Sequence, residues 1–412
     1  MSETLKGACI FAQSGGPTSV INASAYGVIR AALDAPEITN VYCAAHGIVG
    51  VLNETLYDMS LEDDNELRLL LNTPSSEFGS CRYKIADPKK DDTDYKKILE
   101  IFKKYNVRYF FYNGGNDSMD TCLKVNKYFE EVGYDCRVLG VPKTIDNDLV
   151  STDHCPGFGS AAKYIATSVA EVYKDAHVYD TGTITIMEIM GRHAGWLTGA
   201  AALAKLSDAA PDLIYLPEVP FDSDKFLSDV EKVYARKNKC MIAVSEGVRY
   251  ADGTFVSEAT TAQTDGFGHA QLGGLAAILV EKVKQHTGAK VRSIELSLLQ
   301  RCGAHLASQA DIDEAFLAGK MAVEGALAGE TGKMVGLVRE YTDGSYVCKT
   351  SYVQLDGIAN SEKTVPLEWI TADKNFVTQE FIDYAFPLIQ GENTRLVENG
   401  LPRFAKLKKI TI

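Results

Sequence analysis

Short apolar runs that end in glycine turns and lead into helical patterns recur along this chain, and this alternation constrains the fold more than any other feature. In the first unit the run ACIFAQ ends in Ser14, Gly15 and Gly16, and apolar residues then recur at helical spacing up to residue 33. The same order returns, in whole or in part, in residues 107–125, 137–148, 183–204 and 241–247. Repeats of strand, turn and helix predict an α/β fold with parallel sheets. Ligands of such sheets bind beyond the carboxyl ends of the strands, where these turns lie.

Length, charge and cysteine content narrow the class of protein. A chain of 412 residues predicts two or three domains. With 42 basic against 55 acidic residues and no basic block, we expect no nucleic-acid partner. No apolar run approaches the roughly 18 residues of a membrane helix, and the N-terminal residues lack the pattern of a signal peptide, so we expect no membrane association and a cytoplasmic protein. Nine scattered cysteines without a C-x-x-C pair predict reduced thiols.

Two glycine turns at helix starts are suited to hold an anion. Gly15 and Gly16 allow backbone amides to approach a phosphate, although a tight turn alone requires the same residues. Neither a P-loop nor a G-x-G-x-x-G motif accompanies either turn. The second turn carries Asp117, which is equally consistent with a helix cap and with a filter at a phosphate site. As a filter, Asp117 would repel an additional phosphate and leave room for a shorter phosphoryl donor.

The segment PKTIDND, residues 142–148, carries the strongest chemical signal. A lysine, a hydroxyl group and two carboxylates occur within six residues, from Lys143 to Asp148. Phosphoryl transfer uses these groups for charge compensation, positioning, proton abstraction and metal binding. A capped turn after Pro142 would not need all of them, so the segment favours a catalytic loop. A carboxylate suffices as the base, because the reaction gains mostly from positioning and electrostatics.

Basic side chains near predicted strand ends indicate a second anion site. The four arginines are Arg82, Arg192, Arg292 and Arg301. Each alone is typical of a surface ion pair, but together, in a chain of net charge −13, they indicate a local site for a phosphate-bearing substrate. Glu246, after another apolar run, would suit a sugar hydroxyl or an ordinary helix cap. We assign no role to His193, because a histidine at a helix start is more often structural.

The motifs SGGPTSVIN, GGNDSMD, PKTIDND, MGRHAGW, SEG and LLQR occur in this order, and with them the chain resembles the phosphofructokinase family up to about residue 335. The resemblance implies two interleaved Rossmann-like three-layer α/β domains. Residues 1–160, completed by about 303–345, would form the phosphoryl-donor domain, and residues 161–302 the fructose 6-phosphate domain. Residues 346–412 would be a C-terminal extension, to which we assign no role.

The resemblance also implies a reaction. Family members use Mg²⁺ to transfer a phosphoryl group to the 1-hydroxyl of fructose 6-phosphate, giving fructose 1,6-bisphosphate in cytoplasmic glycolysis. ATP-using bacterial members usually have glycine where this chain has Asp117 and Lys143, and this pair is similar to the branch that uses pyrophosphate (diphosphate). We therefore expect a reversible, diphosphate-dependent enzyme of glycolysis and gluconeogenesis. An ATP-dependent enzyme, a non-catalytic sugar-phosphate-binding subunit and sedoheptulose 7-phosphate as a further acceptor stay open.

The roles of individual residues follow from the same resemblance. Asp146 would accept the proton of the sugar hydroxyl, Lys143 would compensate the charge of the transferred phosphoryl group, and Asp117 would occupy the place of the nucleotide's α-phosphate. Gly15 and Arg82 would face the diphosphate. The residues expected at fructose 6-phosphate are Thr144, Asp146, Met190, Gly191, Arg192, Glu246, Arg292, Leu298 and Arg301. A neighbouring subunit would donate Arg292, so we expect a homodimer or homotetramer.

The chain departs from the family's usual residues in three places. Asn116 stands where a metal-binding aspartate is usual, so Mg²⁺ would be held by Asn116 and Asp148 together with the diphosphate and water. Ser297 and Leu298 replace a glycine followed by tyrosine or histidine, which removes one polar contact to the sugar phosphate. Thr183 replaces an arginine that reaches across subunits in allosteric bacterial enzymes, so we expect weak or absent effector coupling.

Overall fold

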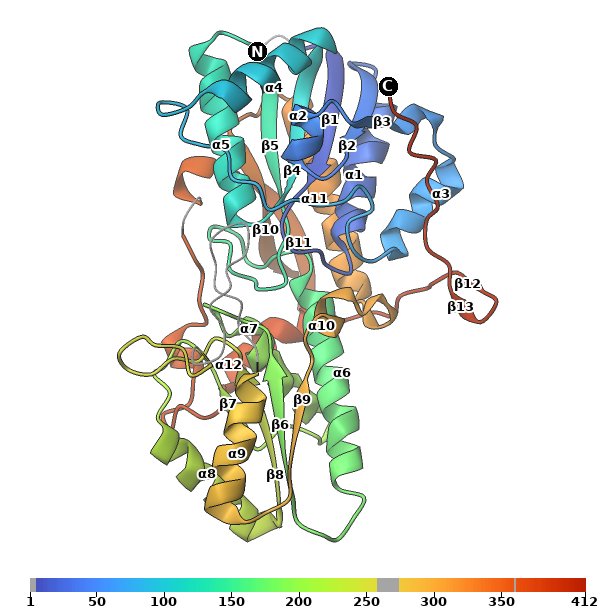
Figure 1. Cartoon of the computed structure of the whole chain (residues 1–412). Coiled ribbons are helices and arrows are strands. Elements are labelled where there is room, and N and C mark those ends of the chain that lie inside the picture. The colour runs from blue at the N-terminus through green and yellow to red at the C-terminus, as the bar shows by residue number, and fades with distance from the viewer. Residues whose placement is uncertain (1–4, 258–273, 359–360) are drawn as a thin grey trace.

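The computed structural model describes residues 5–257, 274–358 and 361–412, which form two α/β lobes around separate sheets (Figure 1). The larger sheet has seven strands in the order β11-β10-β5-β4-β1-β2-β3. Its strands are β1 (Gly7–Gln13), β2 (Ile38–Ala44), β3 (Leu56–Asp58), β4 (Val107–Gly114), β5 (Arg137–Pro142), β10 (Lys333–Thr342) and β11 (Ser345–Gln354). The five inner strands, β10, β5, β4, β1 and β2, pair in parallel with one another, whereas β3 and β11 are antiparallel edge strands.

The central strand β1 explains why the sequence reads as an unbroken apolar run there. Every residue of β1 is buried, and its successive side chains point to opposite faces of the sheet. Cys9 and Phe11 pack with α1 and α11, whereas Ile10 and Ala12 pack with α4 and α5. The bounds of these helices are α1 (Ile21–Asp34), α4 (Thr93–Lys104), α5 (Asn116–Glu131) and α11 (Gln309–Leu327). Gly27 allows α1 to approach α11, because a Cβ there would collide with the carbonyl of Phe316.

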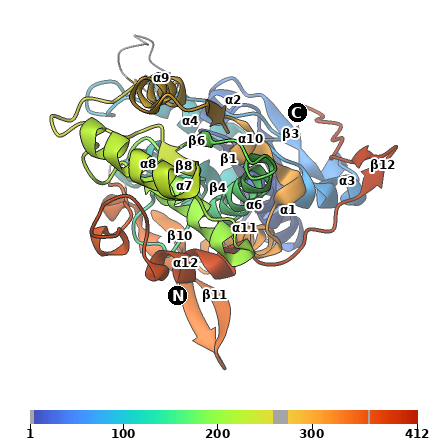
Figure 2. The ribbon, with the colours of Figure 1, turned by 90° about the horizontal axis from the view of Figure 1, so that it is seen from below.

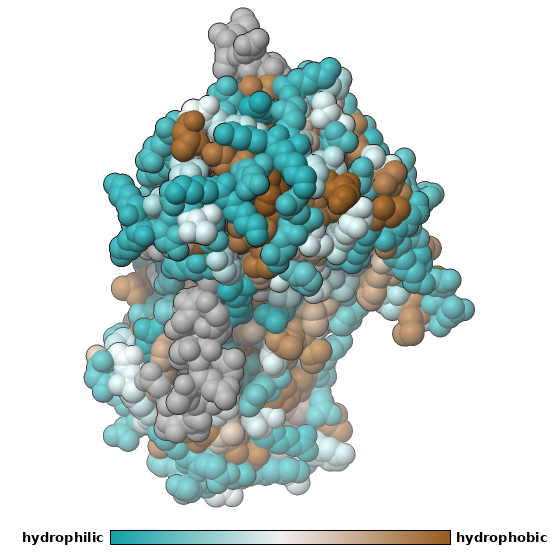
Figure 3. All heavy atoms as spheres, turned by 45° about the horizontal axis from the view of Figure 1, so that its top comes forward, coloured by the Kyte–Doolittle hydropathy of each residue, from teal (hydrophilic) through white to brown (hydrophobic). Residues whose placement is uncertain are grey.

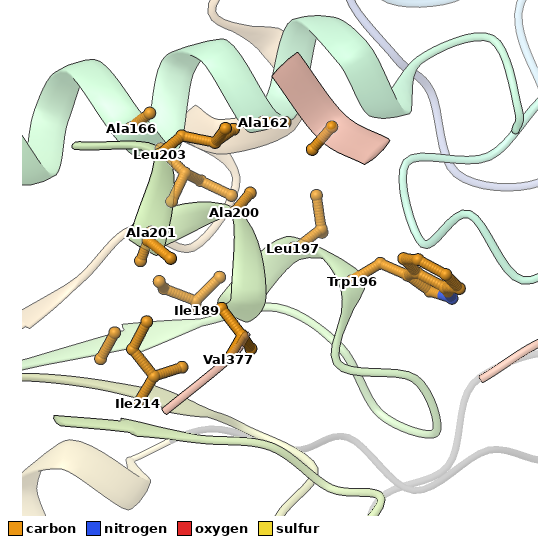
Figure 4. Close-up of a cluster of buried hydrophobic side chains, with 14 of the residues drawn as sticks. Ala162, Ala166, Ile189, Trp196, Leu197, Ala200, Ala201, Leu203, Ile214 and Val377 are labelled. Carbon is orange, nitrogen blue, oxygen red and sulfur yellow. The ribbon is translucent and has the colours of Figure 1, made fainter. Parts of the chain in front are cut away.

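The smaller lobe repeats the same three-layer plan around four parallel strands in the order β7-β8-β6-β9. The strands are β6 (Thr183–Ile189), β7 (Leu213–Tyr215), β8 (Lys239–Ser245) and β9 (Val291–Glu295). The helices are α6 (Phe158–Ala176), α7 (Trp196–Gly199), α8 (Ser223–Lys237), α9 (Leu275–Thr287) and α12 (Gln379–Ala385). Figure 2 shows α9 and α12 on opposite sides of this sheet. Small side chains let α6 pack closely on the 3-10 helix Ala200–Ser207: Ala162 and Ala166 face Ala200 and Leu203 in the cluster of Figure 4.

The C-terminal residues return to both lobes. After β11, residues 361–389 run along the small lobe, where Val365, Phe381 and Leu388 are part of its buried core. The last residues then follow the large lobe, and Thr411 forms a bridge with Tyr57 of β3. The remaining short elements are α2 (Ile48–Leu52), α3 (Asp64–Leu69), α10 (Leu299–Cys302), β12 (Val397–Glu398) and β13 (Leu401–Pro402).

The predicted fold class is confirmed, because both lobes are α/β layers around mainly parallel sheets and the chain passes between them more than once. The predicted domain bounds stay a prediction; the division at residue 345 falls within the hairpin of β10 and β11. No described helix has both the length and the apolarity needed to span a bilayer. All nine cysteines are free thiols. The face in Figure 3 is largely hydrophilic, with hydrophobic side chains in separate groups.

Candidate active site

Residues that follow strands of both sheets line a shared pocket of about 600 Å³. From the large sheet, Gly15 follows β1, Asn116 follows β4 and Lys143 follows β5. From the small sheet, Met190 follows β6 and Glu246 follows β8. The pocket therefore lies at the carboxyl ends of the parallel strands, where the sequence places the ligands.

The pocket brings together most of the residues that the sequence predicts for the site. They are Gly15, Arg82, Asn116, Asp117, Lys143, Thr144, Asp146, Asp148, Met190, Arg192, Glu246 and Arg301. Gly191 does not line the pocket itself, but its amide donates a hydrogen bond to Oε1 of the pocket residue Glu246 at 3.4 Å. Its φ of 142° and the carbonyl of Ala194, 2.6 Å from where a Cβ would stand, require glycine at this position.

Arg292 and Leu298 lie outside the pocket of their own chain. Arg292 is on the edge strand β9, and its guanidinium is 3.6 Å from Oδ2 of Asp175 at the end of α6. Leu298 is 53% exposed at the start of α10. Leu298 does not reach the pocket of its own chain, because it precedes the helix turn that carries Arg301 into the pocket. The edge strand directs Arg292 to the surface, and its expected role in a neighbouring subunit stays a prediction.

Lys143 is buried beneath the first glycine turn. Its Nζ lies 3.1 Å from where a Cβ of Gly15 would stand, so a side chain at Gly15 would crowd the ammonium group. Burial lowers the pKa of Lys143 to about 8; Arg301 and Arg82 act in the same direction, and the carboxylates of Asp146 and Asp148 oppose them. Because these cations share one pocket, the site is organised to attract groups with more than one negative charge.

Asp146 and Asp148 lie on the loop after β5 and are both half-buried. The amide of Asp146 donates to Oγ1 of Thr144 at 3.1 Å, which fixes the start of the loop. Burial raises the pKa of Asp146 above its usual range, although Lys143 and Arg192 act in the opposite direction. Burial, followed by the charge of Asp146, raises the pKa of Asp148 to about 7. A buried carboxylate with a raised pKa is a stronger base than an exposed one, which suits proton abstraction from a hydroxyl group.

The N-terminus of α5 forms the donor side of the pocket. Gly115 caps this 16-residue helix without a side-chain hydrogen bond, and Asp117 lies in its first turn. The Asp117 carboxylate is 3.3 Å from Nζ of Lys84, so its charge is partly balanced by a cation that also lines the pocket. Negative charge is favourable at this helix end, but an anionic ligand must share the position with Asp117.

Asn116 and Asp148 have the chemistry of a divalent-cation site. Nδ2 of Asn116 donates to Oδ2 of Asp148 at 3.3 Å. The buried Oδ1 of Asn116 has no hydrogen-bond partner among the described residues. Hard cations such as Mg²⁺ take carboxylate and amide oxygens as ligands, so the pair fits a cation that also binds phosphate oxygens.

Glu246 and Met190 line the pocket from the small sheet, and Arg301 reaches the first glycine turn, with Nη1 3.4 Å from where a Cβ of Gly16 would stand. Burial raises the pKa of Glu246 to about 7. The amide of Met190 donates to Oε1 of Gln300 at 3.2 Å, which ties the loop after β6 to α10. Burial, together with the charge of Arg82, lowers the pKa of Arg301. The hydroxyl-binding and phosphate-binding groups predicted from sequence therefore lie on one surface.

Three further ionisable side chains, Lys84, His193 and Glu362, line the pocket without having been assigned a role from sequence. Lys84 follows Arg82 by two residues and pairs with Asp117. Nδ1 of His193 is 3.7 Å from Oε2 of Glu362. The sequence GSCRYK could have indicated Lys84, because it lies two residues after the predicted Arg82 and side chains at this spacing point to the same side of an extended chain. Glu362 belongs to the C-terminal segment and has no local motif that would place it in the pocket.

Another cluster of titratable groups lies away from the pocket. The described residues include one group close enough to share a metal ion: His154, Glu314 and Cys348. Both ring nitrogens of His154 are already used, by Asp153 at 2.8 Å and by Glu314 at 2.7 Å. Burial alone would lower the pKa of His154, but the two carboxylates outweigh it and raise the pKa. We therefore interpret the cluster as an ion network around a charged histidine and assign it no metal.

Comparisons with known proteins agree with this geometry. The family model described as phosphofructokinase matches residues 8–326. The chain is 46% identical over 403 residues to the pyrophosphate–fructose 6-phosphate 1-phosphotransferase of Halomonas elongata, covering 97% of this chain and 96% of the relative. It is 43% identical over 408 residues to the protein of the same name from Methylococcus capsulatus, covering 98% and 96%. The crystal structure of a pyrophosphate-dependent phosphofructokinase from Marinobacter aquaeolei superposes with a TM-score of 0.89 at 41% identity, covering 99% of this chain and 97% of that one.

Proposed function

This chain belongs to the phosphofructokinase family, and from that premise we propose that it transfers a phosphoryl group from diphosphate to the 1-hydroxyl of fructose 6-phosphate. The products are fructose 1,6-bisphosphate and phosphate. The observation that carries the proposal is that Asp117 and Lys143 line the same pocket as the half-buried carboxylate of Asp146. Diphosphate and a sugar 1-phosphate are close in energy, so the reaction runs in both directions and serves glycolysis and gluconeogenesis. These pathways place the enzyme in the cytoplasm.

Asp146 is the proton acceptor in this proposal. Its carboxylate takes the proton of the 1-hydroxyl as the oxygen attacks the phosphorus atom of the donor. Lys143 and Arg82 face the transferred phosphoryl group and the leaving phosphate, whose negative charge they compensate. The Gly15 turn leaves space for the donor directly above the Lys143 ammonium group.

The acceptor lies across the pocket, against the small sheet. Arg301 and Arg192 bind the 6-phosphate side, and Glu246 accepts hydrogen bonds from sugar hydroxyls. Thr144 and Met190 complete this surface through the loops after β5 and β6. Holding both substrates in one pocket supplies most of the rate enhancement expected for phosphoryl transfer, because the chemistry itself needs few protein groups.

We assign Mg²⁺ to Asn116 and Asp148. The unpartnered Oδ1 of Asn116 and the carboxylate of Asp148 are the ligands that this chain offers on the donor side. When bound, the cation neutralises part of the charge of the diphosphate. Asp148 would hold the cation, and Asp146, two residues earlier, would stay available as the base.

We also propose that the active unit is a homodimer or homotetramer in which a neighbouring subunit supplies Arg292. Arg292 is half exposed and remote from its own pocket, which supports a role in another subunit. Val178 and Tyr179, which follow the helix end beside Arg292, are each 68% exposed. An exposed apolar pair next to a cation is typical of a surface that becomes buried on association.

The test is turnover by the purified full chain with fructose 6-phosphate and Mg²⁺, run in parallel with diphosphate and with ATP. We expect fructose 1,6-bisphosphate with diphosphate and none above background with ATP. Asp146→Asn serves as the control for contaminating activity, because it removes the base and keeps the shape of the side chain. Turnover with ATP alone would contradict the donor assignment. Binding of fructose 6-phosphate without turnover by either donor would favour a regulatory subunit, and sedoheptulose 7-phosphate in place of the acceptor measures acceptor range.

A further inference from the structure

The residue between the two catalytic-loop carboxylates has an uncommon backbone conformation. Asn147 lies between Asp146 and Asp148, is fully buried and has a φ of 55°. A residue other than glycine adopts this left-handed conformation rarely, although asparagine tolerates it better than most. Because the two neighbouring peptide units rotate with this residue, its conformation sets the directions in which Asp146 and Asp148 leave the chain.

The side chain of Asn147 is held from two sides. Its Oδ1 accepts a hydrogen bond from the amide of Cys155 at 2.9 Å, within the same loop. Its Nδ2 donates to the hydroxyl of Tyr384 at 2.8 Å, and Tyr384 lies 237 residues later on α12. The Tyr384 hydroxyl in turn donates to the carbonyl of Asp153 at 2.7 Å. One hydroxyl group therefore joins the middle of the loop to its end.

The ring of Tyr384 has little freedom to move. It packs against both Trp196 and Trp369, with ring centroids 5.1 and 5.4 Å away, and the guanidinium of Arg339 lies 4.7 Å from its centroid. The cluster of Figure 4, which includes Trp196, holds α12 against the core of the small lobe. The hydroxyl is thus presented to Asn147 from a rigid support.

The same C-terminal segment contacts the loop at a second point. The amide of Lys363 donates to the carbonyl of Asp148 at 2.7 Å. The Lys363 ammonium group donates to the carbonyls of Thr152 at 3.2 Å and Asp153 at 2.7 Å. The indole of Trp196 donates to the Lys363 carbonyl at 2.9 Å. Residues after the end of the family match at residue 326 therefore support the loop on both sides of Asn147.

We propose that Tyr384 is a positioning residue for the active site: its hydroxyl holds Asn147 in the left-handed conformation and so directs the carboxylates of Asp146 and Asp148 into the pocket. The inference rests on the proposed function, because kcat for phosphoryl transfer is the quantity that depends on the directions of the two carboxylates. Tyr384 itself is not expected to touch either substrate, because it does not line the pocket.

The first test is Tyr384→Phe in the full-length chain, which removes the hydroxyl and keeps the ring packing. Displacing a catalytic group by about 1 Å costs up to a hundredfold, so we expect kcat to fall about tenfold or more with the KM values for both substrates unchanged. The matched control is Tyr352→Phe on β11, whose hydroxyl donates a single hydrogen bond to the Met321 carbonyl at 2.9 Å and is not connected to the loop. A kcat within twofold of this control would overturn the proposal.

A double-mutant cycle separates positioning from a general loss of stability. Asn147→Gly removes the side chain that Tyr384 holds, while glycine adopts a positive φ without cost. We expect Tyr384→Phe to change kcat less than twofold in the Asn147→Gly background. An equal loss of kcat in both backgrounds means that Tyr384 acts through something other than Asn147, which refutes the inference.

A second pair of variants tests the same idea if Tyr384→Phe does not fold. Asn147→Ala and Asn147→Gly lose the same two hydrogen bonds, but only glycine accepts the left-handed conformation freely. We expect a lower kcat for the alanine variant than for the glycine variant at equal substrate KM, and equal kcat values would contradict the proposal. Wild-type protein in the same assay separates failure of the proposed function from failure of the Tyr384 inference. An inactive wild type refutes the proposed function, and the variants are then compared by substrate binding and by unfolding.

Discussion

Replacing Asp117 with glycine should allow this enzyme to use ATP. The Asp117 carboxylate lies in the first turn of α5 on the donor side of the pocket and is paired with Lys84 at 3.3 Å. Two unit charges about 4 Å apart repel each other by about 4 kcal/mol at an effective dielectric constant near 20. If Lys84 cancels half of that repulsion, about 2 kcal/mol remains against a third phosphate. Because each 1.36 kcal/mol is tenfold in rate, we expect kcat/KM for ATP to rise between about 30-fold and 900-fold.

The assay compares three variants with the wild type under both donors. Asp117→Gly removes the charge and opens space, whereas Asp117→Asn removes only the charge. Asp224→Gly is the matched control, because Asp224 is the second residue of α8 just as Asp117 is the second residue of α5. Both substitutions place glycine in a first helical turn and remove an acidic side chain that is favourable there, at a similar total cost of about 1 kcal/mol, which the midpoint of thermal unfolding reports.

The results distinguish charge from space. If Asp117→Asn gains most of the ATP activity, charge repulsion excludes the nucleotide; if only Asp117→Gly gains it, the carboxylate acts by its volume. If Asp117→Gly uses ATP no better than Asp224→Gly does, the exclusion argument is refuted and the donor is selected elsewhere in the pocket. We expect kcat with diphosphate to fall in Asp117→Gly, since the Lys84 ammonium group loses its partner.

Three further predictions follow from the same contacts. Asp146→Asn should lower kcat by about 10²-fold or more with little change in the KM for fructose 6-phosphate, because it deletes a base and keeps the shape; an unchanged kcat would remove Asp146 from the mechanism. Arg292→Ala should raise the KM for fructose 6-phosphate, and subunits of Arg292→Ala mixed with inactive Asp146→Asn subunits should regain activity, whereas no recovery would place Arg292 in its own chain's function. For His154 the pKa is raised in the folded state, so its stabilising effect is complete below the ordinary value of about 6.5 and is lost as the pH rises through the folded value. His154→Asn should therefore lower the free energy of unfolding more at pH 6 than at pH 9 in urea titrations, and an equal loss at both values would contradict a charged histidine.

Local sequence patterns predict the fold and most of the site, because the apolar runs mark the strands and most of the site residues directly follow them. Strand β1 is a continuous apolar run because both of its faces are covered. The polar residues that follow β4, β5 and β6 reach the pocket directly from the strand ends. Such residues need no knowledge of distant contacts. Arg292 is different: it lies within the edge strand β9, and periodicity does not tell which of two surfaces an edge residue faces.

The parts that the sequence does not predict depend on contacts between distant segments. Glu362 reaches the pocket only because Lys363 is fixed by the Asp148 carbonyl and the Trp196 indole, and neither contact leaves a periodic signal. In the same way the sequence PKTIDND predicts the reactive groups, but the left-handed conformation of Asn147 that orients them is held by the hydroxyl of Tyr384, 237 residues away. A motif therefore identifies the chemistry, whereas the accuracy of the geometry is determined by the residues after 345, which sequence patterns alone leave without a role. Because these residues also fill the core of the small lobe, they are part of the catalytic unit and not an appendage to it.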